Sequence, residues 1–425
     1  MAAPMTEIPI RVDRATNADR FLATDQTVWF QEVLAAPAEQ QLVGLPEDQR
    51  FAADIDGADP STYPGVYGVF PMTLAVPGPA AGLRQVPCAA LSWVGVHPDH
   101  RRRGVLSAMI RHHLEQVRDE PGNHVSALHA SEPVIYGRYG YGLASLELTV
   151  ELGRQATLTA PGLNDAAADV TTQVTTVTDP DVPARMRRCH LRTADLGAVV
   201  GEVAYYERIC YQPPELLRDK ESWRVLFARR DGEDIGFAVF RRSHKWEKYR
   251  PAGELAVWLL VGDPVGQLVL LRRLVDFDLM ATVKVGKVGV DDPLFLWTGG
   301  PRSTSDVGTY DSLWVRIVDL PDALEARAWT QPCDVVVEVE DVHAPWNHGR
   351  WRIHADASGQ ATVERTSADA EVTLAIGSLG AAYLGGGNLV AQLRAGLVDE
   401  QRAGAVAELS RAMRTPMAPS AAMAF

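Results

Sequence analysis

Residues 66–150 alternate between strand-type and helix-type hydrophobic patterns, and this alternation restricts the fold classes open to the chain. Runs rich in Val, Leu and Ala, at residues 86–96 and 124–130 among others, surround a helix-type segment at residues 103–119. In that segment, steps of three and four residues connect Val105, Ala108, Met109, His112 and Gln116. Strands that alternate with a helix of this kind predict an α/β unit with a mixed sheet.

The chain of 425 residues is too long for one core of ordinary size, because domains hold roughly 100–200 residues. A polar, threonine-rich stretch at residues 157–180 predicts a linker, after which the strand, strand, helix, strand order recurs and indicates a diverged duplication. A loop rich in Gly, Ser and Thr at residues 299–311 predicts a second boundary before a small α+β unit. We therefore predict three units, at residues 1–155, 156–305 and 306–425.

Acidic residues outnumber basic ones, 54 against 41, which gives a formal net charge of −13. A surface of this sign disfavours nonspecific binding to nucleic acid or to an anionic membrane, and it favours cationic partners. No cluster of His and carboxylate residues in the sequence suggests a metal site, so none is predicted.

The cysteines and the N-terminal segment predict a cytoplasmic protein. The four cysteines lie far apart without a C-x-x-C pair, which argues against a zinc ribbon or a redox dithiol and favours reduced core residues: Cys88, Cys189, Cys210 and Cys333. The N-terminal sequence has no apolar signal region, and no stretch approaches the roughly 20 apolar residues that span a bilayer.

The densest chemistry lies at residues 94–106, VGVHPDHRRRGVL, where an apolar strand leads through a basic turn directly into the predicted helix. The N-terminus of a helix exposes unpaired N–H groups and a positive dipole, and three arginines add charge, so this junction suits a polyphosphate. Gly104 would let the backbone approach the phosphates closely. An exposed basic turn without a ligand is the alternative interpretation of the same residues.

The R-x-x-G pattern at residues 101–104 resembles the coenzyme A motif of the GCN5-related N-acetyltransferases, although Leu106 stands where such sequences often have Gly or Ala. A second motif at residues 128–142, LHASEPVIYGRYGYG, makes the resemblance more specific. Together with DSLWVRIVDLPDALEAR at residues 311–327, it is similar to the enhanced intracellular survival (Eis) family of actinobacterial acetyltransferases.

The resemblance implies an architecture and an assembly. Members of that family have an N-terminal acetyltransferase (GNAT) domain, a central GNAT-like domain and a C-terminal α+β domain similar to sterol carrier proteins, and they form homohexamers. In the central unit of this chain, Asp263 and Pro264 stand where the arginines of the first unit stand. An acid at a helix N-terminus repels phosphate, so we expect this unit to lack a coenzyme A site.

The resemblance also implies the residues that bind acetyl-CoA, the cosubstrate. The strand whose backbone amides hold the thioester matches Trp93, Val94 and Val96, and Trp93 would suit the sheet core equally well. The phosphate turn and the two residues expected beside the cofactor are Arg101, Arg102, Arg103, Gly104, Val105, His129 and Ser131. A packed histidine and a satisfied hydroxyl are the structural alternative for the last two.

Tyr136 matches the catalytic tyrosine of the family. A positioned phenol with an ordinary pKa of about 10 keeps its proton at neutral pH and can give it to a departing thiolate. Without the resemblance, Tyr136, Tyr139 and Tyr141 would equally suit aromatic plugs in a glycine-rich turn.

Phe425 ends the sequence, and in the resembling family the terminal carboxylate enters the active site as the general base. A carboxylate there could take a proton from an amine, which is mostly protonated at pH 7. The preceding residue is Ala424, where broad-spectrum family members tend to have an acid. Asp25 and Glu32 lie in the helical segment expected to border the pocket.

The predicted function is acetyl-CoA-dependent N-acetylation of primary amines on small cationic molecules such as aminoglycosides. One alternative is acetylation of lysines or N-termini of proteins and peptides. An alternative from another class is a noncatalytic oligomeric protein that binds a ligand.

Overall fold

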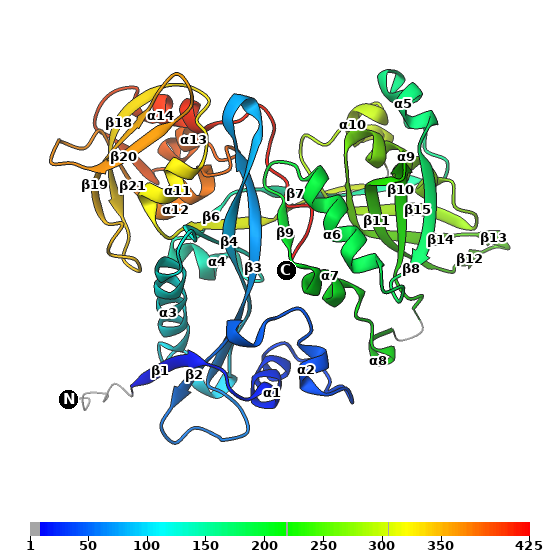
Figure 1. Ribbon diagram of the computed structural model, residues 1–425, viewed down its shortest axis with the longest axis horizontal. Helices are drawn as coiled ribbons and strands as arrows, with labels where there is room; N and C mark the ends of the chain where they lie inside the picture. The colour runs from blue at the N-terminus through cyan, green and yellow to red at the C-terminus, as the bar shows by residue number, and fades with distance from the viewer. Residues whose placement is uncertain (1–8, 218–219, 305) are drawn as a thin grey trace.

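The structure is a computed structural model that describes residues 9–217, 220–304 and 306–425. Three β-sheets organise these residues, and a short hairpin of β12 (Trp246–Glu247) and β13 (Arg250–Pro251) extends from the second sheet's region. In Figure 1 the third sheet lies at the upper left, the second at the right, and the first runs between them toward the bottom. No helix among the described residues is long and apolar enough to cross a membrane.

The first sheet contains the long hairpin that carries the VGV strand. Its strands, in spatial order, are β1 (Ile10–Arg14), β2 (Arg50–Ile55), β3 (Gly65–Pro77), β4 (Leu83–Val96), β5 (Val125–His129), β17 (Leu313–Ile317) and β6 (Gly142–Leu143), with β9 (Val199–Gly201) paired to β3. Its helices are α1 (Ala18–Val28), α2 (Ala38–Gln41), α3 (Val105–Asp119) and α4 (Pro133–Tyr136).

The second sheet repeats the plan of the first around the central part of the chain. Its strands, in spatial order, are β16 (Asp306–Asp311), β7 (Leu146–Gly153), β15 (Met280–Val288), β14 (Gly253–Gly262), β11 (Glu233–Ser243), β10 (Arg224–Arg230) and β8 (Thr171–Thr176). The helices are α5 (Asn164–Ala168), α6 (Val182–Thr193), α7 (Val203–Cys210), α8 (Pro214–Leu217), α9 (Pro264–Val275) and α10 (Leu294–Trp297). A helix links a parallel pair in both sheets, β4–α3–β5 and β14–α9–β15, which agrees with the predicted duplication.

The third sheet is smaller and is covered by short helices. Its strands, in spatial order, are β20 (Ala361–Arg365), β19 (Gly349–Ala355), β18 (Cys333–Glu340), β21 (Val372–Ala375) and β22 (Val398–Glu400). The helices are α11 (Leu320–Ala326), α12 (Ile376–Ala382), α13 (Leu389–Arg394) and α14 (Ala405–Met413). The predicted α+β character of the last unit is confirmed.

The sheets exchange strands across the predicted boundaries at residues 155 and 305. Strand β7, from the first predicted unit, pairs with β15 and β16 in the second sheet. Strand β17, from the third, pairs with β5 and β6 in the first sheet. Hydrophobic pattern identifies a strand, but the partner of a strand depends on contacts far away in the sequence, so linear division of the chain does not describe the sheets.

Three local predictions need correction. The threonine-rich stretch is not all linker, because β8 pairs along β10 as an edge strand. The Gly-rich loop before the last unit likewise ends in β16, which pairs along β7. The helix predicted at residues 103–119 begins at Val105, and its buried side chains are Val105, Met109, Ile110, His113, Leu114 and Val117.

The last twelve residues, 414–425, leave α14 and cross to the other two units. The Gly385 carbonyl accepts from the Thr415 N–H, Asp291 accepts from the Ala418 N–H, and the Leu196 carbonyl accepts from the Ser420 N–H. Side chains near the end are buried, including Met423 at 1 % exposure. In Figure 1 the chain consequently ends near the centre of the molecule, above α7. We call residues 414–425 the tail.

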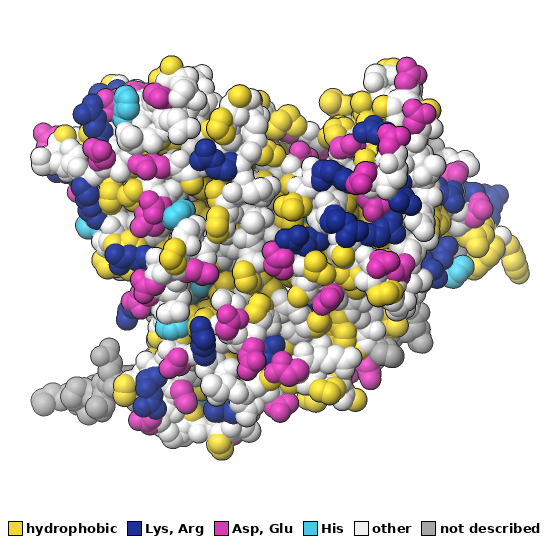
Figure 2. Space-filling model, in the orientation of Figure 1, with side chains coloured by type: hydrophobic (Ala, Val, Ile, Leu, Met, Phe, Trp, Pro, Cys, Tyr) yellow, Lys and Arg dark blue, Asp and Glu magenta, His cyan; other side chains and the backbone are white. Residues whose placement is uncertain are grey.

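The charge of the surface is unevenly distributed. Figure 2 shows Lys and Arg side chains gathered over the central unit, while Asp and Glu are scattered over the same face. Helix α6 contributes several of its arginines to ion pairs, among them Arg185 with Asp234 and Arg187 with Glu202. The net charge of the chain therefore does not make every face acidic.

Candidate active site

Strands β4 and β5 form a V-shaped opening in the first sheet. They run parallel but pair only at two positions, Ala89 with Ser126 and Ala90 with Ala127. Strand β4 then continues to Val96 and β5 to His129 without further pairing between them. Backbone groups on the facing edges of the opening are therefore free to bind an extended ligand arm.

A β-bulge at Trp93 marks the start of the opening. The pairing of β4 with β3 shifts by one residue between Ser92 and Gly95, and Trp93 has a φ of 56°. A bulge bends its strand and disrupts the ladder locally. The bulge therefore directs the end of β4 away from β5, so that the two strands do not pair beyond it.

The amides of Val94 and Val96 point into the opening. The His97 N–H donates to the Pro64 carbonyl across the edge shared with β3, at 3.0 Å. Because the backbone groups of an antiparallel strand alternate in direction, Gly95 faces β3 as well, and the flanking Val94 and Val96 face the opposite edge. These are two of the three residues that the sequence predicted for binding the thioester.

The basic turn connects this opening to α3. Arg102 has a φ of 61° and Gly104 a φ of 86°, and Gly104 is the N-cap of α3 without a side-chain cap. Consequently the first N–H groups of α3 lack a capping partner. The side chain of Val105 is in the core, so only its backbone can face a phosphate.

The three arginines of the turn are exposed, and no described residue forms an ion pair with any of them. Their guanidinium groups are thus available to a polyanion beside the uncapped helix N-terminus. The free amides of β4, the uncapped α3 and these arginines fit the elongated, phosphate-bearing shape of acetyl-CoA. When bound, acetyl-CoA supplies the acetyl group as a thioester.

Replacement of Arg102 by Ala is expected to raise the KM for acetyl-CoA several-fold while kcat changes little. An exposed charge contact of this kind is worth about 0.5–1 kcal/mol and weakens with salt. Steady-state kinetics at low and high ionic strength measure the effect. Arg154→Ala, on an exposed pair of the central unit, is the charge-matched control; equal KM values for the Arg102 variant and the control would contradict the assignment.

The three tyrosines of the YGRYGYG segment have different environments. Tyr141 hydroxyl bonds to Ser126 Oγ at 2.9 Å, and Ser126 bonds to His113 in the same buried network. Tyr139 hydroxyl bonds to Ser107 Oγ at 3.0 Å. The aromatic-plug interpretation therefore describes these two residues, whose hydroxyl groups are satisfied inside the fold.

Tyr136 differs because no described residue hydrogen-bonds to its hydroxyl group. It ends α4, its ring is 8 % exposed, and it packs edge-on against Tyr141 at 6.0 Å between centroids. Burial, with the Glu132 carboxylate second, raises the pKa of Tyr136 to about 12. The phenol is therefore protonated at neutral pH and has a free O–H to donate.

The tail brings Phe425 to the end of β5. Its ring packs edge-on against the His129 imidazole, with centroids 5.0 Å apart. Tyr205 of α7 donates a hydrogen bond to the Ala424 carbonyl. Burial lowers the pKa of His129 to about 3, with Lys287 as the second cause, so the imidazole is neutral. His129 is thus a packing partner of the chain end and not an acid at neutral pH.

A charged pair that the sequence did not predict lies on the α1 side of the bulge. Arg208 of α7 lies over the Trp93 ring, 4.5 Å from its centroid, and Trp93 packs near Phe21 at 6.1 Å. Burial raises the pKa of Asp25 to about 7, although the positive Arg208 opposes this shift. Asp25 is 3 % exposed, whereas Glu32 is exposed beyond α1.

Arg208 was not predicted as a site residue, because it lies in the predicted central unit and nothing in the sequence indicates that α7 packs on the first sheet. Ser131, by contrast, was predicted to lie beside the cofactor. It is exposed just beyond the end of β5, and no described residue hydrogen-bonds to its side chain. Trp93 is half-buried, and it contacts both α1 and α7.

In the central unit, the junction between β14 and α9 corresponds to the basic turn between β4 and α3, but its residues differ. Asp263 caps α9, and its Oδ1 accepts a hydrogen bond from the Gly266 N–H at 2.7 Å. An amide that is free in α3 is thus occupied here, by a carboxylate that also repels phosphate. Strands β14 and β15 pair at five positions, up to Val257 with Val285, and β14 then continues to Gly262 without further pairing to β15, so the two copies differ in the capped helix and not in the parting of the strands.

Comparison with known families assigns two regions. Residues 14–144 match the acetyltransferase (GNAT) domain family, and residues 320–422 match the sterol carrier protein domain family. These two matches cover the first sheet's main hairpin with α3 and most of the third unit.

Comparison with curated proteins gives relatives along most of the chain. An uncharacterized N-acetyltransferase of Streptomyces coelicolor is 39 % identical over 365 residues, 84 % of each chain. The N-acetyltransferase Eis of Mycobacterium bovis is 32 % identical over 350 residues, 78 % of each chain.

Among solved structures, Eis1 from Mycobacterium abscessus is 27 % identical, with a TM-score of 0.80, and the match covers 98 % of this chain and all of that one. A GCN5-related N-acetyltransferase from Anabaena variabilis, at 17 % identity and a TM-score of 0.77, shares the fold. The open β4–β5 edge and these relatives agree: the chain is an N-acetyltransferase that uses acetyl-CoA, and it belongs to the Eis family of GCN5-related N-acetyltransferases.

Proposed function

We propose that this enzyme acetylates primary amines of small cationic molecules, with aminoglycosides as the first class to test. The observation that carries the proposal is the course of the tail, which puts Phe425 against His129 at the open end of β5. An acidic group beside the acceptor would attract an ammonium group, and we assign this role to Asp25 of α1, the helix whose Phe21 packs near Trp93.

The proposed reaction is direct transfer of the acetyl group. The Phe425 carboxylate accepts a proton from the acceptor amine, and the amine attacks the thioester carbonyl. The free amides of Val94 and Val96 suit the oxygen on which negative charge develops. As the intermediate collapses, Tyr136 donates its proton to the sulfur of the departing thiolate, and the nitrogen loses a second proton to the carboxylate, which has by then released the first to solvent. An ammonium acceptor thus loses two protons in all: one replaces the proton that Tyr136 gave to the thiol product, and one is released to solvent.

The acceptor class is tested by thiol release from acetyl-CoA with a panel of aminoglycosides, polyamines and lysine-containing peptides. Turnover with the first two and not with peptides supports the proposal. Turnover with peptides alone would establish the alternative, acetylation of proteins or peptides. The purely ligand-binding alternative no longer stands, because the chain is an N-acetyltransferase.

We also propose assembly into a homohexamer, on the family resemblance alone. Sedimentation of the purified chain measures the mass of the assembly, and a monomer at micromolar concentration would contradict this proposal.

The KM of a cationic acceptor is expected to rise as the pH falls through about 7. Because the pKa of Asp25 is raised to about 7, its carboxyl group is neutral below that pH and negative above it. An attraction of one unit charge in partly buried surroundings is worth about 1–2 kcal/mol, or roughly a ten-fold change in KM. Asp25→Asn should remove this pH dependence of the acceptor KM, while Arg208 is still present. If the variant keeps the pH profile of the original protein, Asp25 does not contribute to acceptor binding.

A further inference from the structure

A cavity of about 910 Å³ lies where the three units meet, and the tail forms part of its wall. Its walls come from the turn between β3 and β4, the segment after α6, the start of α9, the loop before α10, a turn of the third unit and the tail. No residue that we assign to acetyl transfer is among those that line it. The volume lies within the range of roughly 300–1,000 Å³ that holds small organic ligands.

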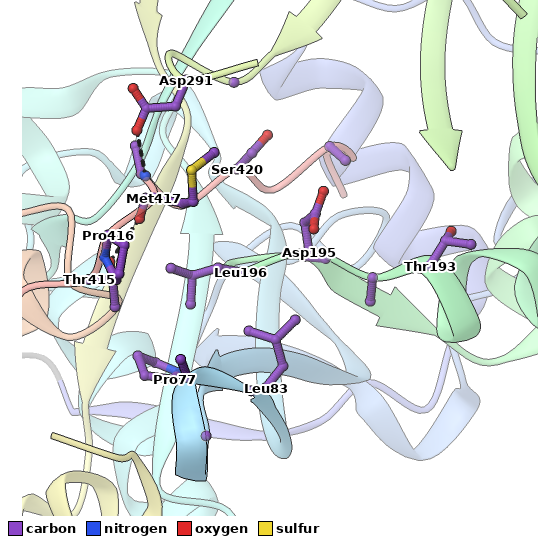
Figure 3. Close-up of a pocket in the computed structure, with 18 of the residues that line it drawn as sticks. Pro77, Leu83, Thr193, Asp195, Leu196, Asp291, Thr415, Pro416, Met417 and Ser420 are labelled. Atoms are coloured by element: carbon purple, nitrogen blue, oxygen red, sulfur yellow. Dashed lines mark hydrogen bonds between the residues drawn. The ribbon is translucent and has the colours of Figure 1, made fainter. Parts of the chain in front are cut away.

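Much of the cavity wall is apolar. Figure 3 shows Pro77 and Leu83, Leu196, and Pro416 and Met417 of the tail around one space. Leu83 and Met417 are 44 % and 55 % exposed, although large apolar side chains normally avoid water. Burial of this surface by a ligand's hydrocarbon would be favourable, at roughly 25 cal/mol per Å².

Three carboxylates in the same wall lack a cationic partner. Asp195, Asp291 and Asp292 line the cavity, and no described residue forms an ion pair with any of them, although Asp291 accepts a hydrogen bond from the Ala418 N–H. Burial, with the negative charge of Asp195 as a smaller cause in the same direction, raises the pKa of Asp292 to about 6, although the hydrogen bond from the Leu294 N–H opposes the shift. Lys287 also lines the cavity, but its ammonium group contacts Glu147 at 3.4 Å.

A buried histidine adds an unsatisfied polar atom to the wall. His190 is 1 % exposed, and its Nδ1 bonds to the Tyr206 hydroxyl at 2.9 Å. Its Nε2 is buried without a hydrogen-bond partner, although the residue lines the cavity. Because buried polar atoms are normally paired, Nε2 indicates a missing partner, such as a polar group on a ligand.

We propose that this cavity is a binding site for an amphipathic organic cation, whose apolar body covers Leu83 and Met417 and whose positive group lies between Asp195 and Asp292. The charge chemistry excludes anions, because these uncompensated carboxylates repel them. The apolar walls disfavour a fully hydrated inorganic cation. This site is separate from acetyl transfer and stands whether or not the proposed acceptor class is correct.

Isothermal titration calorimetry of the full chain with octyltrimethylammonium tests the proposal at pH 7.5, where Asp292 is ionised. This quaternary probe cannot be acetylated. Octanoate and 1-octanol carry hydrocarbon chains of similar length without the positive charge. We expect a Kd for octyltrimethylammonium at least ten-fold lower than for either of the other two. Equal affinities, or tighter binding of octanoate, would overturn the proposal.

Substitutions in the cavity wall test where the positive group of the probe binds. Asp195→Asn and Asp292→Asn should each raise the Kd about ten-fold, and in Asp292→Asn the Oδ1 that accepts from the Leu294 N–H is retained. Asp231→Asn, on an exposed turn with a φ of 52°, is the matched control and should leave the Kd unchanged. Leu83→Arg, at an exposed position, replaces apolar wall by a tethered cation and should also weaken binding. Binding that is lost in Asp25→Asn but retained in all three cavity variants would overturn the site.

Discussion

Replacement of Tyr136 by Phe is expected to lower kcat about 100-fold or more while the KM for acetyl-CoA stays close to its original value. Donation of a proton by a positioned side chain contributes roughly 10²- to 10⁴-fold to a rate, and Phe keeps the ring that packs on Tyr141. With its pKa raised to about 12, Tyr136 holds its proton over the neutral pH range. Steady-state kinetics with saturating acetyl-CoA measure the change.

Tyr139→Phe is the matched control for that experiment. It removes a hydroxyl of the same segment, but one that bonds to Ser107. We expect it to reduce the free energy of unfolding by about 1 kcal/mol and to leave kcat nearly unchanged. If both variants keep full kcat, Tyr136 is not the general acid.

The second large effect is expected when residues are added after Phe425. A three-residue extension, Gly-Ser-Gly, would move the terminal carboxylate three residues beyond Phe425, whose ring packs on His129, and should lower kcat about 100-fold, since it removes the proposed general base. Met423 is buried and Ala424 is tied to Tyr205, so the chain end has little freedom to readjust. The same three residues fused before Met1 provide the control.

Two further variants of the chain distinguish the role of the Phe425 carboxylate from that of its ring. A semisynthetic chain that ends in the Phe425 amide keeps the ring against His129 but loses the negative charge, and it should be as impaired as the extended chain. Phe425→Ala keeps a carboxylate and loses the ring contact, so we expect a smaller loss of kcat. Full activity of the amide form would exclude the carboxylate as the base.

The sequence predicted the strand, turn and helix at residues 94–106 because the signals of this junction are local. The apolar strand, the arginines and Gly104 are consecutive, and each acts through backbone geometry or charge within a few residues. The structure confirms that α3 begins directly after Gly104, which has the left-handed φ that favours glycine. The opening between β4 and β5 is different, because it depends on the bulge at Trp93 and on which strand lies beside β4.

The surroundings of Asp25 could not be predicted from local pattern. Burial raises the pKa of Asp25 to about 7, and Arg208 of α7, which is distant in the sequence, opposes that shift. The same holds for the cavity, whose walls come from all three units. A net charge of −13 did predict a preference for cations in general, but not that Asp195 and Asp292 would face one apolar space.

The sequence by itself determined the chemistry available: a polyphosphate turn at the start of a helix, a glycine-rich segment with three tyrosines, and a central copy with an acid in place of the arginines. Only the tertiary structure decided which of these groups act together. It satisfied the hydroxyl groups of Tyr139 and Tyr141 and left that of Tyr136 free, and it brought the tail back to β5. The physical reason is that local backbone preference fixes turns and helices, whereas burial and hydrogen-bond partners depend on contacts between residues that are not neighbours in the sequence, here from 15 positions apart, for Ser126 and Tyr141, to several hundred, for His129 and Phe425.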